Sequence, residues 1–347
     1  MEKKNSIQNR LPFFIFAASL IVRAIYLWQQ QTNPLNAYPL GDSVTYMREA
    51  ERILSGDWAG SRVFTFGGAA FYPYFLALIF SVAGKSVLTV QIIQFFMGAL
   101  TCTLIYLIGE KLYGKRVAVL LGVTSALFPP FLFHEGLLLT GSPGLLFLIS
   151  GLYLLVCREK MPHLFFAGLA LGLSVLCRPN TLLLAPLFFG WILTGKSLKR
   201  VKAALLFFVG VSVVIFPVTL RNYLVGKDLV LISSSGGLNF FIGNNPLSKG
   251  IFSIPPNLEI SNDSRMYITS ESYARKETGR ELKPSEVSTF WFKKGTDFIF
   301  SDPGKAFVLL LKKISLFFNA REITNLYKFN FFSEHSSLLP LSVPPER

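Results

Sequence analysis

The chain has 347 residues, of which 51% are hydrophobic and only 16% charged, and its mean hydropathy is +0.47. This composition excludes an ordinary soluble domain and indicates an integral membrane protein. The formal net charge is +14, but lysine and arginine occur in short clusters between apolar segments. Because they form no basic stripe on a polar face, nucleic acid is not an expected partner.

The first apolar segment, Leu11–Trp28, follows a basic amino terminus. It is too long for the apolar part of a signal peptide, and no small-x-small cleavage site follows it, so it predicts an uncleaved membrane helix. Arg23 lies within this segment, about one turn from its outer end. A charge at this depth is either functional or extends to the lipid headgroups, and the sequence favours neither.

A charged stretch, "YPLGDSVTYMREAERILSGD", comes next. Its apolar residues have helical spacing, and Asp42 or Ser43 is expected to cap the helix amino terminus. We therefore predict an amphipathic helix on the outer membrane surface, with an apolar face formed by Val44, Met47, Ala50, Ile53 and Leu54. The following "FYPYFLALIFSVAG" is short and contains a proline, which favours a juxtamembrane or re-entrant helix.

Further apolar segments predict an all-α polytopic membrane protein of about seven transmembrane helices. After Leu11–Trp28, the predicted spans are Val87–Ile108, Val117–Leu139, Pro143–Cys157, His163–Cys177, Thr181–Thr194 and Ala203–Val225. Residues 1–226 thus form the predicted membrane core, including a first outer loop over residues 29–86. Residues 227–347 are turn-rich at first and then alternate apolar and basic positions, which predicts a mixed outer region with interfacial helices.

The basic residues occur in every second connection between the predicted spans. Because lysine and arginine are retained in the cytoplasm, this alternation predicts a multi-pass protein of the cytoplasmic membrane with its amino terminus inside. The inner basic residues are Lys3, Lys4, Arg10, Lys111, Lys115, Arg116, Arg158, Lys160, Lys196, Lys199, Arg200 and Lys202.

Several polar residues fall at the outer ends of the predicted spans, where charge is costly unless it has a function. One acid and several cations on one membrane face suit an anionic ligand whose leaving phosphate must be neutralised. Each residue also has a purely structural explanation, such as a helix cap for Asp42 or a headgroup anchor for Arg178. The candidates from position alone are Asp42, Glu135, Arg178, Arg221 and Asn222.

Other common sites have no signature in the sequence. There is no P-loop, no GxGxxG after a strand and no DxD pair for a metal-bound nucleotide sugar. His134 has no second histidine or cysteine at ligand spacing, so we predict no metal site, no cofactor and no metal requirement.

Six segments, in order, resemble the polytopic C-type (GT-C) bacterial membrane glycosyltransferases related to the protein O-mannosyltransferases of family 39 and the lipid A aminoarabinose transferases. They include "YPLGDSVTYMREAERILSGDW", "ALFPPFLFHEGLLLT", "FFAGLALGLSVLCRPNTLLLAPL" and "LRNYLVGKDLVLISSSGGLNFFIGNN". The resemblance covers Tyr38 to about Ile323. Relatives continue through further spans, so the resemblance also predicts that this chain is short at its carboxyl end.

The resemblance implies transfer of a sugar from a polyprenyl-phosphate donor to a lipid, glycan or protein acceptor on the outer membrane face, with inversion. Asp42 would deprotonate or hold the acceptor hydroxyl, and Arg178 and Arg221 would stabilise the departing lipid phosphate. The substrate cavity would be lined by Tyr46, Glu135, Asn222 and Asn244. The alternatives are a catalytically inactive or fragmentary protein that binds lipid-linked sugars and, less favoured because the charges gather on one face, a transporter or flippase.

Overall fold

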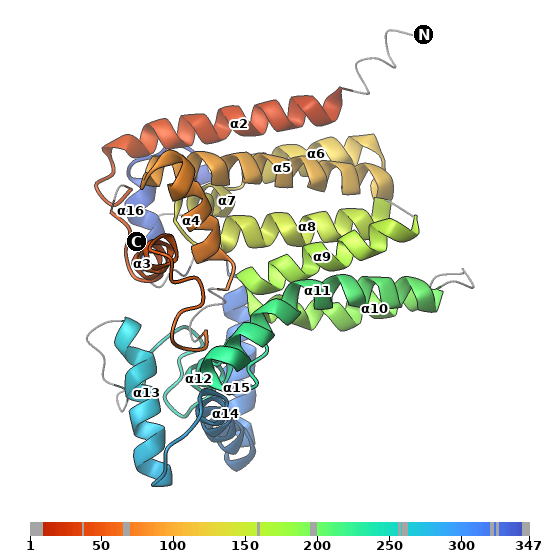
Figure 1. Ribbon diagram of the computed structural model, residues 1–347. Helices are drawn as coiled ribbons and strands as arrows, with labels where there is room; N and C mark the ends of the chain where they lie inside the picture. Colours follow the sequence, from red (N-terminus) through yellow and green to blue (C-terminus); the bar gives the residue numbers. More distant parts are fainter. Residues whose placement is uncertain are drawn as a thin grey trace, which may run out of the picture.

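The computed structural model describes residues 10–36, 38–64, 70–157, 160–194, 200–255, 258, 263–319, 323 and 326–341. Every regular element within these ranges is helical. Long apolar helices lie side by side in a bundle, and shorter helices gather at the end of the bundle opposite the amino terminus (Figure 1). We call this the α3 end, after helix α3 (Asp42–Leu54).

The bundle is held together by close contacts between small residues. Helix α9 packs between α8 and α11. A Cβ on Gly168 of α9 would overlap the carbonyl oxygen of Phe207, and a Cβ on Gly210 of α11 would overlap that of Phe165. Small residues allow such close backbone approach between membrane helices. The bundle elements are α2 (Leu11–Gln29), α5 (Val87–Tyr113), α6 (Lys115–Ala126), α7 (Pro129–Gly136), α8 (Gly141–Cys157), α9 (Met161–Cys177), η2 (Pro179–Leu184), α10 (Ala185–Thr194) and α11 (Arg200–Gly226).

Three of the described helical segments are long and apolar enough to cross a membrane, namely Leu11–Thr32, Val87–Tyr113 and Arg200–Gly226. The helices α6 and α7, bent by 45° relative to each other, pass the same test as a pair. The remaining apolar helices have 10–17 residues: Tyr72–Ala83, Gly141–Cys157, Met161–Cys177 and Pro179–Thr194. The predicted spans fall on helical segments, one of them broken, and this confirms the all-α membrane architecture predicted from the sequence. The number of seven spans stays a prediction.

Two prolines change the predicted elements. The predicted span Val117–Leu139 is broken before Pro129, where Phe128 adopts an extended conformation (ψ 110°). A residue that precedes proline disfavours the helical conformation, which explains the break. Pro73, in contrast, lies in the first turn of α4 (Tyr72–Ala83), where it starts the helix instead of interrupting it.

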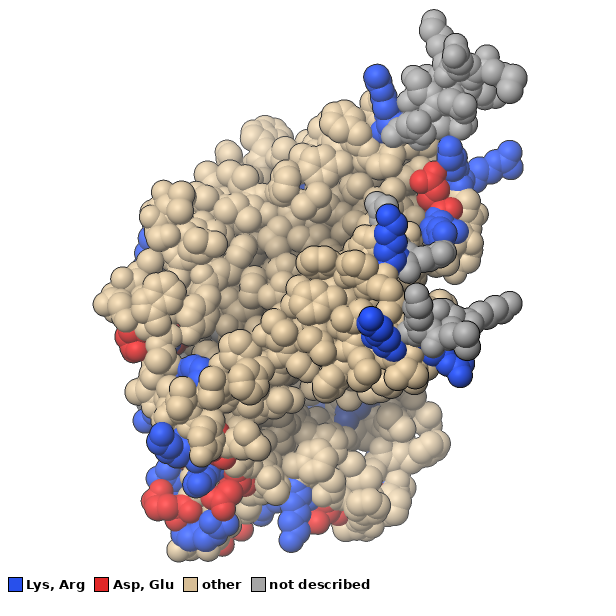
Figure 2. All heavy atoms as spheres, turned by 45° about the vertical axis from the view of Figure 1, so that its right-hand side comes forward, with Lys and Arg blue, Asp and Glu red and all other residues tan. Residues whose placement is uncertain are grey.

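The charges are segregated along the bundle. Figure 2 shows lysine and arginine at the end near the amino terminus, and a belt with almost no charge beside them. Apolar side chains such as Phe13, Leu120 and Phe208 are exposed on the bundle, as expected for a lipid-facing surface. The described part of the basic end contains Arg10, Lys111, Lys115, Arg116, Lys160, Arg200 and Lys202.

At the other end, α3 (Asp42–Leu54) packs on α4 through Tyr46, Ala50 and Ile53. The cap of α3 is Gly41, whose φ of 53° and ψ of −121° suit glycine, so the prediction that Asp42 or Ser43 is the cap was wrong. The other elements here are η1 (Gln30–Thr32), α12 (Gly236–Gly243), α13 (Asp263–Thr278), α14 (Pro284–Ser301), α15 (Pro303–Phe317), α16 (Phe329–Ser333) and η4 (Leu339–Leu341).

Candidate functional site

Two cavities lie at the α3 end, and each contains part of the predicted site. The first, which we call the Asp42 cavity, has a volume of about 280 Å³ and lies between α3, the loop 55–64, α11 and α13. Asp42, Tyr46 and Arg221 line it. The second, which we call the Arg178 cavity, has a volume of about 340 Å³ and is lined by Glu135 and Arg178.

Tyr46 lines the Asp42 cavity and is affected by charges of both cavities. Its side chain is 4% exposed and packs edge-on against Tyr72, with ring centroids 5.2 Å apart. Burial raises the pKa of Tyr46, the nearby Asp42 carboxylate raises this pKa further, and the Arg178 guanidinium lowers it. The acid of one cavity and the cation of the other therefore act on the same hydroxyl group, which stays protonated and can donate a hydrogen bond.

Asp42 is the first residue of α3 and its side chain is exposed. The backbone before it is fixed by Tyr327, whose hydroxyl accepts a hydrogen bond from the Leu40 amide at 2.6 Å and lies 3.2 Å from Ser43 Oγ. Tyr327 is almost 300 residues away in sequence. Sequence reasoning missed it, since a lone tyrosine beyond the last predicted span carries no local signal.

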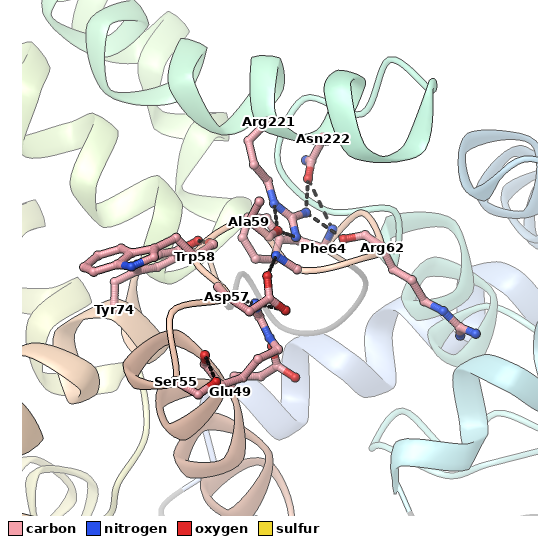
Figure 3. Close-up of polar contacts among 12 residues, drawn as sticks. Glu49, Ser55, Asp57, Trp58, Ala59, Arg62, Phe64, Tyr74, Arg221 and Asn222 are labelled. Atoms are coloured by element: carbon pink, nitrogen blue, oxygen red, sulfur yellow. Dashed lines mark hydrogen bonds and ion pairs between the residues drawn. The ribbon is translucent and has the colours of Figure 1, made fainter.

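Arg221 holds the loop that covers the Asp42 cavity. Its Nε donates to the Ala59 carbonyl at 2.7 Å, its Nη1 to the Arg62 carbonyl at 2.7 Å, and its guanidinium lies 4.1 Å from the centre of the Phe64 ring (Figure 3). Nη2 also bonds the Ala59 carbonyl. Most of the donors of Arg221 are thus engaged by backbone carbonyls of this chain.

An ion pair joins the same loop to α3. Asp57 Oδ2 lies 3.1 Å from Arg52 Nη1, and Asp57 Oδ1 accepts a hydrogen bond from the Gly60 amide at 2.8 Å. The Gly60 amide, together with Arg52, holds the pKa of Asp57 below its usual value. In Figure 3 the side chain of Arg62 extends away from Arg221. Arg62 and Arg48 line the cavity and were not among the predicted site residues.

Asn222 and Asn244 lie outside both cavities. Asn222 is fully buried, and its Nδ2 donates to the carbonyls of Val230 and Ile232 at 3.0 Å each. Its Oδ1 accepts a hydrogen bond from the Phe64 amide at 3.3 Å. Asn244 ends α12, where its Oδ1 accepts a 2.8 Å hydrogen bond from Lys313. The geometry assigns both side chains to the support of loops and helix ends.

Glu135 forms a buried ion pair with Arg23. Its two carboxylate oxygens lie 2.7 Å from Arg23 Nε and 2.8 Å from Arg23 Nη2, and the two residues are 4% and 1% exposed. Arg23 Nη1 also donates to the Ser19 carbonyl at 3.2 Å. Arg23 therefore points into the bundle, and its extension to the headgroups, which the sequence left open, does not occur.

Two glutamines of α5 satisfy the backbone that follows Glu135. Gln94 Nε2 donates to the carbonyls of Glu135 at 2.8 Å and Leu137 at 2.7 Å, and its Oε1 accepts a 2.6 Å hydrogen bond from Tyr72. Gln91 Nε2 donates to the Gly136 carbonyl at 2.9 Å. Buried polar groups need such partners in a membrane interior. These glutamines rigidify the wall of the Arg178 cavity.

Arg178 follows the last residue of α9, and its side chain is exposed. No hydrogen bond or ion pair joins this side chain to the described part of the chain. It lies near Gly141 and Gly144 at the start of α8, where the glycines leave space beside it. Apolar side chains complete the cavity, among them Phe128, Phe131, Leu145 and Leu148. The arrangement can bind an anionic group attached to an apolar chain.

A metal site has no counterpart in the described ranges, which contain no group of three or more histidine, cysteine or acidic side chains able to hold an ion. The predicted independence from metal ions remains a prediction.

Comparison with known proteins gives one family match. Residues 68–220 match the family model of the dolichyl-phosphate-mannose-protein mannosyltransferases, while a search of curated proteins finds no match. The matched stretch is less than half of the chain and includes Glu135 and Arg178. Asp42 and Tyr46 precede it, and Arg221 is the first residue after it. This match confirms the resemblance to C-type membrane glycosyltransferases that the sequence motifs predicted.

Proposed function

We propose that the chain is a membrane glycosyltransferase that moves a sugar from a polyprenyl-phosphate donor to an acceptor hydroxyl at the α3 end of the bundle. The observation that carries this proposal is that Asp42 in one cavity and Arg178 in the other lie at the same end of the bundle, near enough to Tyr46 for both charges to shift the pKa of its hydroxyl. The family match over residues 68–220 supports the donor class.

The Arg178 cavity is the proposed donor site. Its apolar lining, with Phe128, Phe131, Leu145 and Leu148, suits a prenyl chain, while Arg178 at its edge suits the phosphate. Arginine binds phosphate oxygens through charge-assisted hydrogen bonds. The Tyr46 hydroxyl, on the wall of the Asp42 cavity, can donate a further hydrogen bond to the sugar.

The Asp42 cavity is the proposed acceptor site. Asp42 accepts the proton of the acceptor hydroxyl while the oxygen of that hydroxyl forms a bond to the anomeric carbon. The bond from the anomeric carbon to the phosphate oxygen breaks, and its electron pair leaves with the lipid phosphate, which Arg178 neutralises. A single displacement of this kind inverts the configuration at the anomeric carbon.

The other predicted residues act indirectly in this mechanism. Arg221 and Asn222 fix the loop 57–64 over the acceptor site, and Glu135 with Arg23 fixes a wall of the donor site. The chemistry requires no metal ion, since protein groups supply both the base and the cation. Retained transfer in the presence of a chelator is the expected result.

The reaction is proposed to occur on the outer face of the cytoplasmic membrane, with the amino terminus inside. Lysine and arginine occur in the short connections between bundle helices at the end near the amino terminus, which supports this orientation. Labelling of a cysteine at Ser55 by an impermeant reagent added to intact cells tests it, and protection of Ser55→Cys in intact cells would reverse the assignment.

The decisive experiment compares the wild-type chain with Asp42→Asn in membranes supplied with radiolabelled undecaprenyl-phosphate sugars. Because a general base contributes about 10²–10⁴-fold, Asp42→Asn should reduce transfer by at least about 100-fold. The matched control is Asp297→Asn on the exposed side of α14, which should transfer at the wild-type rate. Equal transfer by Asp42→Asn would remove Asp42 from the mechanism. Donor binding without transfer to any acceptor would favour a protein that only binds lipid-linked sugars.

A further inference from the structure

Helix α15 exposes an apolar stripe that runs from its second turn to the residue after its last. Its members recur at intervals of three, four and seven residues, so they share one side of the helix. Their exposed fractions range from 47% to 82%, far above what large apolar side chains of a water-facing helix usually show. The stripe consists of Phe307, Leu310, Leu311, Ile314, Phe317 and Phe318.

The opposite side of α15 is fixed to the protein. Leu309 is buried, and Lys313 donates a 2.8 Å hydrogen bond to Asn244 at the end of α12. Leu316 packs against Gly250. Asp302 caps the helix, since its side chain accepts a hydrogen bond from the Lys305 amide at 3.1 Å. These contacts determine which side of α15 faces outward.

The direction of α15 is unlike that of the bundle helices. Figure 1 shows it running across them, at the level where α8 and α9 end on the α3 side. With 15 residues it is about 22 Å long, too short to cross a membrane, and its orientation places it along the membrane surface. The helix therefore lies where headgroups and acyl chains meet.

The charges of α15 indicate what covers the stripe. Lys305 and Lys312 are exposed and seven residues apart, so they share one side of the helix, and by helical spacing this side lies opposite the apolar stripe. The stem of Lys312 lies beside Leu316 at Gly250, and Lys305 pairs with Asp302 at 3.1 Å. No acidic residue occurs between Pro303 and Phe317. A helix with one exposed apolar side and lysines on the opposite side, lying along the membrane surface, has the pattern of an amphipathic helix that rests on the acyl chains of a bilayer.

We propose that α15 is an in-plane membrane anchor, with its apolar stripe inserted among the acyl chains at the α3 end and with Lys305 and Lys312 on the side of the helix that faces away from the bilayer. Through Lys313 and Asn244 this anchor holds α12, and with it α14, against the membrane surface. The proposal does not depend on glycosyl transfer, and its failure would leave the catalytic proposal untouched.

The test uses the full chain, with Cys157 replaced by serine, in vesicles of phosphatidylcholine and phosphatidylglycerol that contain doxyl-labelled lipids. A fluorescent label is placed at Leu310→Cys or Phe317→Cys on α15. Lys276→Cys on the exposed side of α13 is the water-facing control, and Phe208→Cys on α11 is the lipid-facing control. Doxyl groups near the headgroup should quench both α15 labels several-fold more strongly than the Lys276 label. Doxyl groups deep in the bilayer should quench the Phe208 label more strongly than the α15 labels.

Two outcomes would overturn the proposal. Labels on α15 that are quenched no more than the Lys276 label would place the stripe in water, and self-quenching between labelled chains in place of lipid quenching would indicate a protein partner.

Discussion

Arg23 and Glu135 form a two-fold hydrogen-bonded ion pair inside the bundle, although 112 residues separate them in sequence. Both side chains are almost completely buried, at 1% and 5% exposed. The pair joins α2 to α7 and forms part of the boundary of the Arg178 cavity. Its position makes it a structural support of the proposed donor site.

Removal of one partner from this pair should strongly destabilise the protein. Arg23→Gln or Glu135→Gln leaves the other charge buried without a counterion, which costs about 3–5 kcal/mol. Combining Arg23→Leu with Glu135→Leu should recover most of the loss, because no buried charge remains. Thermal unfolding in detergent measures each change. Lys85→Gln, which breaks an exposed pair with Glu51, is the control and should cost less than about 1 kcal/mol.

A single glycine makes room for the Glu135 carboxylate. A Cβ at Gly98 would overlap this group, which Arg23 holds in place, so either α5 or α7 must shift in Gly98→Ala. We expect a loss of about 1–3 kcal/mol in the free energy of unfolding. Gly190→Ala in α10 is the matched control, since no atom lies within 4 Å of its added Cβ. Gly190→Ala should leave the free energy of unfolding unchanged or raise it slightly. Equal losses of stability in both variants would show that close packing against Glu135 is not the cause of the effect at Gly98.

Local patterns in the sequence predicted the membrane helices but not their partners. Hydropathy located the seven apolar segments, and lysine and arginine marked one end of the bundle. The outer acid and cations were found because a charge beside an apolar run is locally visible. The pairing of Arg23 with Glu135 was not predicted, because it depends on how α2 and α7 pack and no residue near Arg23 indicates its partner.

Arg221 shows the same limit within the site itself. Its position at the end of a span suggested a phosphate ligand, yet its donors engage carbonyls of a loop about 160 residues earlier. Tyr327, which fixes the backbone before Asp42, carries no pattern of its own. Sequence order thus predicts which residues lie at the α3 end, whereas their contacts follow from packing.

Arg178 should affect donor use more than folding, because its side chain is exposed. Charge-assisted hydrogen bonds contribute about 1.5–3 kcal/mol, so Arg178→Gln should lower kcat/KM for the lipid-linked donor by about 10- to 100-fold. Arg178→Lys keeps the charge and should retain more activity. Lys276→Gln on α13 is the control for loss of an exposed cation. Unchanged kcat/KM for the donor in Arg178→Gln would show that Arg178 does not bind the donor phosphate.

Arg221→Gln distinguishes a loop clamp from a substrate ligand. Since each lost hydrogen bond contributes about 1 kcal/mol, the amides of Gly60 and Phe64 should exchange with deuterium about 5- to 30-fold faster in this variant. In Arg221→Lys the shorter list of donors reaches fewer of the loop carbonyls. The exchange rates of this variant should therefore lie between those of the wild-type chain and those of Arg221→Gln. Gly279, whose amide bonds the Arg275 carbonyl at the end of α13, is the internal reference and should not change. Loss of sugar transfer with unchanged exchange in the loop 57–64 would contradict the clamp and place Arg221 in direct contact with the leaving phosphate.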